Sequence, residues 1–269
     1  MRLGLGSYTY TWAIGVPGQE PARPLTAPDL VRRAAAAGVG CVQIADNLPL
    51  DALGDSEQRD LRTLAAEMAV AIEVGARGLT AERLERFLDL AVFFHSPILR
   101  FVIDGPGHEP TIDDVVGVVS AALPRLRETG VRLAIENHDR LKATEFREIV
   151  LRTDPEWVGI CLDSVNSMGA GEGVREVVAE LAPHTLNLHL KDFTVERVSH
   201  KMGFTVTGCP AGQGMLNVPW LLGEIRKHGR CQSAILELWT PPAGSIEETI
   251  AREAAWADES LRFLEPLFA

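Results

Sequence analysis

The sequence lacks a long apolar run and an excess of positive charge. No stretch reaches the roughly eighteen consecutive apolar residues that a membrane-spanning helix needs, so no membrane span is predicted. Lysine and arginine together number 26 against 37 aspartates and glutamates, which gives a net charge of −11. Because phosphate binding relies on lysine and arginine, this balance argues against nucleic acid as a partner.

Cysteine is also scarce, and its positions do not suggest disulfides. The four residues Cys41, Cys161, Cys209 and Cys231 have no tight spacing, and two of them fall inside predicted strands. Buried free thiols in a reducing compartment fit this pattern better than disulfides. The opening stretch, residues 1–6, is too short and too rich in glycine for a signal peptide. We therefore expect a cytoplasmic protein.

Two familiar sequence motifs, one catalytic and one for nucleotide binding, are missing. There is no Gly-x-Ser-x-Gly elbow, which disfavours a serine hydrolase of that class. No Gly-x-Gly-x-x-Gly turn follows the first predicted strand, since Gly4 and Gly6 lie within that strand. This second absence disfavours a doubly wound open sheet.

What is present is a repeat of strand followed by helix, with no linker or low-complexity segment. Capping patterns at Thr26 and Thr111 open two of the helices. The alternation predicts a single (β/α)8 TIM barrel over residues 1–269. The strand-like runs begin near Leu3, Cys41, Val70, Ile98, Arg132, Gly159, Leu186 and Ala234.

Two connections are longer than a bare barrel needs. One follows the first strand, at residues 8–25, and the other follows the seventh strand, at residues 192–217. Loops of this length without secondary structure of their own are usually lids or binding loops. Within the second loop, the pair Gly212 and Gly214 is expected to make a tight turn.

The seventh predicted strand and the strands near it contain the candidate catalytic and metal-binding residues. Residues 186–191 read Leu-Asn-Leu-His-Leu-Lys, a strict alternation that predicts a strand with His189 and Lys191 on its inner face. Three other apolar runs end in an acid, at Glu136, Asp163 and Glu237. A single strand-terminal acid is usually a cap or a solvated residue. Four such positions on successive strands instead predict a divalent metal site, because carboxylates and imidazole suit such an ion.

The order Glu136, Asp163, His189-Leu190-Lys191-Asp192, Glu237 resembles the pattern of the xylose isomerase-like superfamily, which includes sugar isomerases, 3-epimerases, inosose dehydratases and endonuclease IV. The resemblance covers essentially the whole barrel. It implies one divalent cation bound by Glu136, Asp163, His189 and Glu237, with manganese expected and magnesium or cobalt as alternatives. It also implies that Glu136 and Glu237 form an acid–base pair.

The sequence departs from the family at two points. Asn166 stands where many epimerases of the family have histidine. Endonuclease IV holds three zinc ions with many more histidines than the seven of this acidic chain. More narrowly, residues 7–15, 191–193 and 202–204 are similar to a branch assigned as 3-oxo-isoapionate decarboxylases.

These observations predict an isomerase- or epimerase-like enzyme of carbohydrate metabolism, acting on a small keto sugar or keto sugar acid through a metal-stabilised enediolate. The alternative is a lyase that decarboxylates a 3-oxo sugar acid such as 3-oxo-isoapionate, and a non-catalytic sugar-binding barrel is the third hypothesis. The sequence leaves the exact substrate and a homo-oligomeric state open. The expected catalytic residues are Glu136, Glu237 and Lys191, and the expected substrate-binding residues are Tyr8, Trp12, His138, Asn166 and Arg197.

For several of these residues a plainer role competes. Lys191 could pair with Asp192 or another acid of the barrel mouth, and Arg197 could be a solvated loop residue. Lys191 and Arg197 together would suit a substrate with an extra carboxylate, because charge-assisted contacts hold carboxylates strongly. We expect the loop that follows the seventh strand to bring Arg197 to the mouth beside Lys191.

Overall fold

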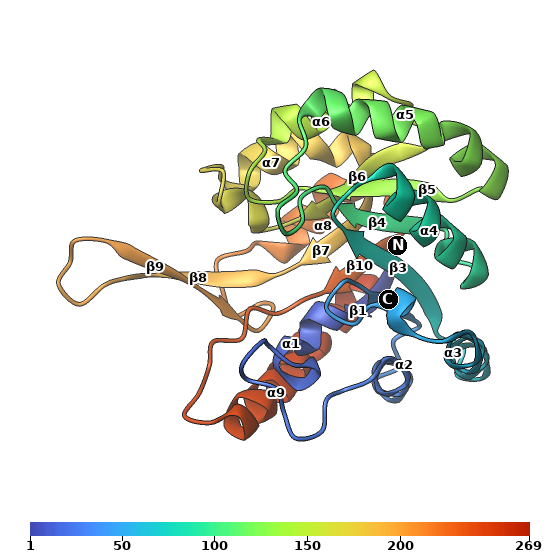
Figure 1. The fold of residues 1–269 in the computed structure, drawn as a ribbon. Helices are drawn as coiled ribbons and strands as arrows, with labels where there is room; N and C mark the ends of the chain where they lie inside the picture. Colours follow the sequence, from blue (N-terminus) through green and yellow to red (C-terminus); the bar gives the residue numbers. More distant parts are fainter.

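A computed structural model describes residues 1–269. Eight parallel strands close into a barrel and helices surround it, with one two-stranded ribbon projecting outward (Figure 1). Around the barrel the strand order is β1-β10-β7-β6-β5-β4-β3-β2. The barrel strands are β1 (Arg2–Gly6), β2 (Cys41–Ile44), β3 (Ala71–Arg77), β4 (Ile98–Val102), β5 (Arg132–Glu136), β6 (Val158–Asp163), β7 (Thr185–Leu190) and β10 (Ser233–Leu236).

The predicted TIM barrel is confirmed, and each barrel strand begins within one residue of its predicted start. Short apolar runs become buried parallel strands because helices cover the outer face of the barrel. Within the barrel the pairing Asp163↔His189 places two strand-end polar residues side by side. The register therefore sets the site at the carboxyl ends of the strands, as expected for this fold.

The helices pack their apolar faces on the barrel. Both predicted N-caps are present: Thr26 and Thr111 accept hydrogen bonds from backbone N–H groups in their first turns. Leu84, Phe87 and Leu88 are buried on one face of α4. The helices are α1 (Thr11–Ile14), α2 (Ala27–Ala36), α3 (Asp55–Glu67), α4 (Ala81–Phe93), α5 (Ile112–Thr129), α6 (Ala143–Arg152), α7 (Val174–Leu181), α8 (Val218–Arg226) and α9 (Ile246–Phe268).

The two long connections have secondary structure of their own. Residues 8–25 contain most of the 3-10 helix η1 (Ser7–Tyr10) and the whole of α1. Residues 192–217 contain an antiparallel ribbon of β8 (Asp192–Arg197) and β9 (Phe204–Cys209), where the sequence analysis expects a loop. The difference has a local cause, because Thr-Val-Glu and Phe-Thr-Val-Thr are alternating runs of residues that favour strands.

The structure also bears on the predictions about the cysteines and about a membrane span. All four cysteines are free thiols, three of them buried. None of the helices is both long enough and apolar enough to cross a membrane. The cytoplasmic location stays a prediction.

Candidate metal centre and substrate pocket

The structure brings the four predicted ligands together. Glu136 is the last residue of β5, Asp163 the last of β6, His189 lies near the end of β7, and Glu237 directly follows β10. All four side chains are buried, with at most 1% of their surface exposed. Gly6 on β1 leaves room for this packing, since a Cβ there would lie 3.0 Å from Glu237 Cγ.

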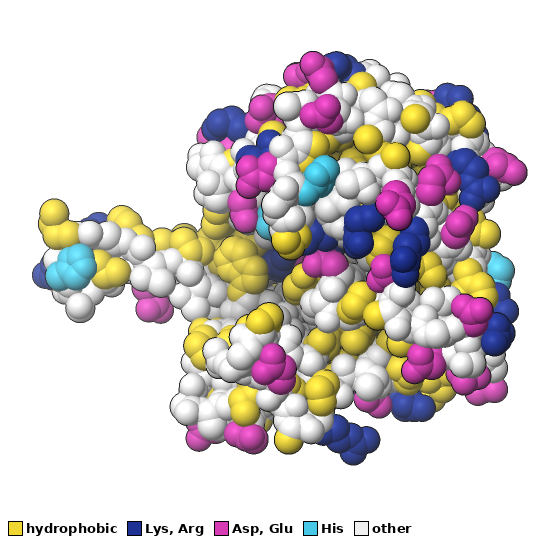
Figure 2. Space-filling view, in the orientation of Figure 1, with side chains coloured by type: hydrophobic (Ala, Val, Ile, Leu, Met, Phe, Trp, Pro, Cys, Tyr) yellow, Lys and Arg dark blue, Asp and Glu magenta, His cyan; other side chains and the backbone are white.

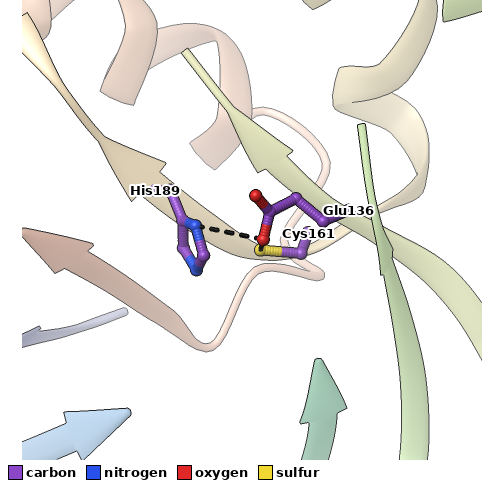
Figure 3. A group of neighbouring side chains, drawn as sticks. All are labelled: Glu136, Cys161 and His189. Atoms are coloured by element: carbon purple, nitrogen blue, oxygen red, sulfur yellow. Dashed lines mark hydrogen bonds and ion pairs between the residues drawn. The ribbon is translucent and has the colours of Figure 1, made fainter. Parts of the chain in front are cut away.

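The imidazole of His189 lies at the centre of this cluster. Its Nδ1 atom is 3.4 Å from Glu136 Oε2, 3.7 Å from Asp163 Oδ2 and 3.5 Å from Glu237 Oε1. Figure 3 shows the ring and the Glu136 carboxylate facing one another across the barrel mouth. One nitrogen thus faces three carboxylates from three different strands.

A buried amide network sets which nitrogen of His189 carries the proton. His189 Nε2 lies 2.6 Å from Gln43 Oε1, while Gln43 Nε2 donates to Glu73 Oε2 and to Asn187 Oδ1. Because the Gln43 oxygen must then be the acceptor, His189 Nε2 is the donor. This arrangement leaves a lone pair on Nδ1, directed at the carboxylates, as in histidines that ligate metals.

The remaining donor atoms fit a divalent cation. Asp163 uses Oδ1 to accept the backbone N–H groups of Val165 and Asn166, which leaves Oδ2 without a hydrogen bond. His189 Nδ1, Asp163 Oδ2 and Glu237 Oε2 are buried and make no hydrogen bond. Donor atoms of these three residues all lie within 4.8 Å of one another. Lys191 offsets the charge of the two carboxylate oxygens, whereas the neutral His189 Nδ1 faces only carboxylates, and a bound cation would satisfy that nitrogen.

Lys191 compensates part of the negative charge. Its Nζ lies 2.8 Å from Asp163 Oδ2 and 2.9 Å from Glu237 Oε2, at ion-pair distance but without hydrogen-bond geometry. Burial alone would raise the pKa of Asp163, but the charge of Lys191 lowers it below its usual range. Lys191 therefore pairs with two mouth acids, as its plainer role predicts.

Asp192 is not a partner of Lys191. Its carboxylate accepts the backbone N–H groups of Gly212, Gly214 and Leu216 at 2.8–3.0 Å. A Cβ at Gly214 would lie 2.2 Å from Asp192 Oδ1, so only glycine allows this close approach. The expected tight turn at Gly212 and Gly214 is thus built around the Asp192 side chain.

Cys161 lies two residues before Asp163 on β6 and pairs with Glu136 of β5, so it lies beside Glu136 and His189 (Figure 3). Its Sγ lies 3.0 Å from Asn187 Oδ1, to which it donates. Burial raises the pKa of the Cys161 thiol, and the charge of Glu136 raises it further. A thiol held protonated in this way is a poor metal ligand, because the thiolate is the ligating form.

Replacing Cys161 by serine is expected to lower the free energy of unfolding by about 1 kcal/mol and to leave metal content and turnover close to the parent values. The serine hydroxyl can still donate to Asn187, and the change lies below the donor atoms. Urea unfolding and metal analysis of the variant test this. A normally folded, normally metallated Cys161→Ser protein without turnover would contradict it.

Arg100 on β4 is a site residue that the sequence analysis missed. Its side chain is only 2% exposed, its Nε donates to Glu136 Oε2, and its Nη1 donates to Asp46 Oδ1 at 3.1 Å. Burial alone would raise the pKa of Glu136, but the charge of Arg100 lowers it. A lone arginine inside the apolar run Ile-Leu-Arg-Phe-Val was the pattern that could have revealed it.

A pocket of about 490 Å³ opens above the cluster, at the carboxyl ends of the strands. Glu136, Lys191 and Glu237 form part of its wall, while Asp163 and His189 are fully buried beneath it. Its lining residues are Tyr8, Thr11, Trp12, Arg77, Arg100, Glu136, His138, Asp139, Asn166, Lys191, Glu237, Leu238, Trp239 and Thr240.

Four of the five expected substrate-binding residues line this pocket. Tyr8 donates to Asp46 Oδ2 at 3.0 Å, and Trp12 Nε1 donates to the Thr240 carbonyl at 2.8 Å. Asn166 Nδ2 donates to Glu136 Oε1 at 2.9 Å. His138 Nε2 lies 3.1 Å from Nη2 of Arg77, a pocket residue that the sequence analysis also missed.

Arg197 does not reach the pocket, and its expected position is corrected. It ends β8, on the projecting ribbon, where its guanidinium lies 4.4 Å from the Phe204 ring centroid and donates to the Lys201 carbonyl. The backbone turns outward after Asp192 into the ribbon, so Arg197 is carried away from the barrel mouth (Figure 1). Arg77 lies in the pocket instead.

Glu253 on α9 supports the pocket wall from behind. Its two carboxylate oxygens accept the backbone N–H groups of Trp12 and Ala13, each at 3.0 Å. Burial is the largest influence on this group and raises its pKa to about 7, although both hydrogen bonds and Arg33 favour the charged form. Glu253 thus holds the segment that carries Trp12.

Glu253 is expected to contribute a loss of stability as the pH rises from about 4.5 to 7. Between its unfolded pKa near 4.5 and its folded pKa near 7, the folded protein binds the extra proton, so rising pH favours unfolding. The difference corresponds to at most on the order of 3 kcal/mol. Thermal melts of Glu253→Gln across this range should show a flatter pH dependence than the parent. Identical pH dependence in both proteins would contradict this assignment.

The comparison with known protein families identifies the class of protein. Residues 15–267 match the family described as xylose isomerase-like TIM barrel, and the chain belongs to this family. Membership and the intact set of four predicted ligands identify an enzyme, which leaves the non-catalytic hypothesis without support.

The chain is similar to one curated enzyme in sequence and to several solved structures in fold. It is 32% identical to 3-oxo-isoapionate decarboxylase from Pectobacterium atrosepticum over 264 residues, covering 98% of this chain and 95% of the relative. The solved structure of D-psicose 3-epimerase from Clostridium cellulolyticum H10 shares the fold, with a TM-score of 0.71, 14% identity, and 98% and 97% coverage. A xylose isomerase-like TIM barrel protein from Mycobacterium smegmatis in complex with magnesium has a TM-score of 0.70, 16% identity, and 100% and 98% coverage.

Proposed function

We propose that this protein is a divalent-metal-dependent decarboxylase of a small 3-oxo sugar acid, which was the alternative in the sequence analysis. The main support for the proposal is that both carboxylate oxygens of Glu136 accept hydrogen bonds. Arg100 Nε donates to one of its oxygens and Asn166 Nδ2 to the other. Epimerisation needs two groups that exchange protons, one on each face of the substrate. A glutamate that is held charged by Arg100 and Asn166 keeps lone pairs for a metal ion, and it suits the role of a ligand better than that of a proton carrier.

The ion is proposed to be bound by Glu136, Asp163, His189 and Glu237, with manganese as the expected metal. When bound, such an ion polarises a carbonyl oxygen and offsets the negative charge that develops on it. Support for a divalent ion comes from His189 Nδ1, which faces three carboxylates without a hydrogen bond, and from the magnesium complex of the Mycobacterium smegmatis structure.

The proposed reaction breaks one carbon–carbon bond. The bond between the carboxylate and the adjacent carbon cleaves, carbon dioxide leaves, and the electron pair forms an enediolate with the neighbouring 3-oxo group. A proton must then reach the carbon that lost carbon dioxide. Lys191 Nζ lines the pocket between Asp163 and Glu237, which keep it charged, and we assign it as the donor. Solvent then restores its proton.

Arg77 is proposed to hold the substrate carboxylate, in the role that the sequence analysis gave to Arg197. Its side chain is 30% exposed in the pocket wall. Nε lies 3.3 Å from Asp46 Oδ2 but makes no hydrogen bond, and Nη2 contacts His138. Several of the five guanidinium N–H groups are therefore available, and a planar guanidinium binds a carboxylate through two parallel hydrogen bonds.

The test compares substrates on the manganese-loaded protein in heavy water. A 3-oxo sugar acid such as 3-oxo-isoapionate should release carbon dioxide and give a product with one deuterium at the new C–H bond. D-psicose and D-tagatose should exchange no carbon-bound hydrogen. Exchange or epimerisation of a ketose, without carbon dioxide from the acid, would overturn the proposal in favour of the epimerase-like reading.

A pair of variants tests the carboxylate site. Arg77→Ala should raise KM for the 3-oxo sugar acid by about tenfold or more, as expected for a lost charge-assisted contact. Arg197→Ala is the matched control, since that arginine lies outside the pocket. Equal KM values for the two variants would show that Arg77 does not bind the carboxylate.

A further inference from the structure

Glu73 on β3 is a buried acid that belongs neither to the predicted ligands nor to the pocket wall. Acidic side chains are common on the surface shown in Figure 2, but Glu73 is only 3% exposed. Its Oε2 atom accepts hydrogen bonds from Gln43 Nε2 at 3.1 Å and from Asn187 Nδ2 at 3.3 Å. The second bond reaches from β3 to β7, across the barrel interior. Carboxylates are rarely buried to this extent unless such partners compensate for the lost water.

The backbone fixes the orientation of the Asn187 amide. Asn187 Nδ2 donates to the carbonyl oxygen of Ser233 at 3.4 Å, and a carbonyl oxygen can only accept. The other amide atom, Asn187 Oδ1, is therefore the oxygen that accepts from Gln43 Nε2 at 3.0 Å. The Gln43 amide nitrogen thus donates to two oxygens, one of Glu73 and one of Asn187. Its own oxygen must face His189.

The three carboxylates of the predicted metal site favour the opposite arrangement at His189. They face Nδ1 at 3.4–3.7 Å and would attract the imidazole proton to that atom. A neutral ring with its proton on Nδ1 cannot offer that nitrogen to a cation, and its Nε2 would need a donor.

Gln43 could supply such a donor only if its amide group flipped. The flip would bring the Gln43 oxygen against Glu73 Oε2 and Asn187 Oδ1, both of which are acceptors. Glu73 therefore opposes the tautomer of His189 that the three carboxylates favour.

We propose that Glu73 is a positioning residue of the metal site, which holds the Gln43 amide so that His189 presents an unprotonated Nδ1 to the ion. Groups outside the ligand shell commonly orient a ligand histidine in this way. The proposal rests on the proposed role of His189 as a metal ligand. It adds a carboxylate that acts from β3 through Gln43, without a hydrogen bond or ion pair to His189 itself.

Nitrogen NMR of the metal-free protein tests the tautomer directly. The ring signals of His189, assigned by their loss in His189→Ala, are recorded at a pH that leaves the imidazole neutral. In the parent protein the proton should be on Nε2. In Glu73→Leu, which removes the acceptor, most rings should carry it on Nδ1. A merely structural role would change the free energy of unfolding without moving this proton. A parent protein with the proton on Nδ1 would overturn the proposal, whatever the variants do.

Manganese affinity at the same pH gives a linked result. Glu73→Leu should raise the Kd for Mn²⁺ by about tenfold, at the lower end of the range for outer groups, because Asn187 Oδ1 still opposes the flip. This loss corresponds to about nine-tenths of the rings in the wrong tautomer, and the NMR spectra should agree with it. Glu73→Gln keeps an acceptor oxygen and should bind Mn²⁺ almost as well as the parent.

Ser233→Ala is the matched control. The Ser233 hydroxyl accepts from Asn187 Nδ2 at 2.8 Å and makes no hydrogen bond with Gln43. Its loss removes a buried hydrogen bond of the same network, and both the tautomer and the Mn²⁺ affinity should stay close to those of the parent.

A double variant tests whether Glu73 acts through Gln43. If it does, Glu73→Leu should weaken Mn²⁺ binding little further in a Gln43→Ala protein, whereas independent effects would add. Additive losses would overturn the proposal, and so would a folded Glu73→Leu protein with the parent tautomer and affinity. A parent protein that has the Nε2 proton and binds no Mn²⁺ would instead contradict the proposed metal site.

Discussion

Replacing His189 by alanine is expected to lower the affinity for manganese by at least about 100-fold and to remove turnover with it. Even the residues that orient a metal ligand contribute 10- to 100-fold to affinity, so loss of the ligand itself should cost no less. His189 Nδ1 lies within 3.7 Å of carboxylate oxygens from three strands, so no other nitrogen replaces it. Titration calorimetry with Mn²⁺ and a parallel activity assay measure both effects.

Gln43→Ala serves as a graded comparison. Gln43 accepts a hydrogen bond from His189 Nε2 and does not contact the predicted ligand carboxylates, so its loss should weaken manganese binding by about 10- to 100-fold and less than His189→Ala does. Asp163→Ala should resemble His189→Ala. Unaltered manganese affinity in a folded His189→Ala protein would show that the ion binds elsewhere.

Arg100→Met should be the most destabilising single change in the pocket wall. Arg100 is buried with Glu136, and removing one partner of a buried ion pair typically costs about 3–5 kcal/mol because the other charge is left uncompensated. Asp46 loses a partner as well. Urea unfolding of the metal-free protein, with chelator present, gives the free energy of unfolding directly.

Two further variants distinguish the effect of losing the buried ion pair from nonspecific destabilisation of the fold. Arg125→Met removes an ion pair with Asp89 in which both side chains are well exposed, and should cost at most about 1 kcal/mol. Adding Glu136→Gln to Arg100→Met should recover part of the stability, since the unpaired charge is then gone. If Arg100→Met were no more destabilising than Arg125→Met, the buried pair would not have the importance assigned to it.

The barrel could be predicted from the sequence because its strands are short apolar runs separated by capped helices. Thr26 and Thr111 mark helix starts by a local hydrogen bond, which a sequence pattern captures well. The ribbon at 192–209 was harder to foresee. Asp192 binds backbone N–H groups twenty to twenty-four residues further along the chain, and nothing local in the sequence reveals that contact.

The candidate site could be predicted only in part, for a related reason. Acids at strand ends converge in any barrel, so Glu136, Asp163 and Glu237 were found from position alone. Arg100 fell within an apolar strand, and its role depends on pairing with Glu136, 36 residues away. Arg197 was placed at the mouth by proximity in sequence to Lys191, but the ribbon carries it outward.

The most direct test of the metal site is a crystal structure of the protein grown with Mn²⁺, using anomalous scattering to locate the ion. Our interpretation predicts one strong peak at the barrel mouth, with donor atoms of Glu136, Asp163, His189 and Glu237 at roughly 2.0–2.6 Å. A peak bound by other residues, or a structure in which any of these four side chains turns away from the ion, would contradict it.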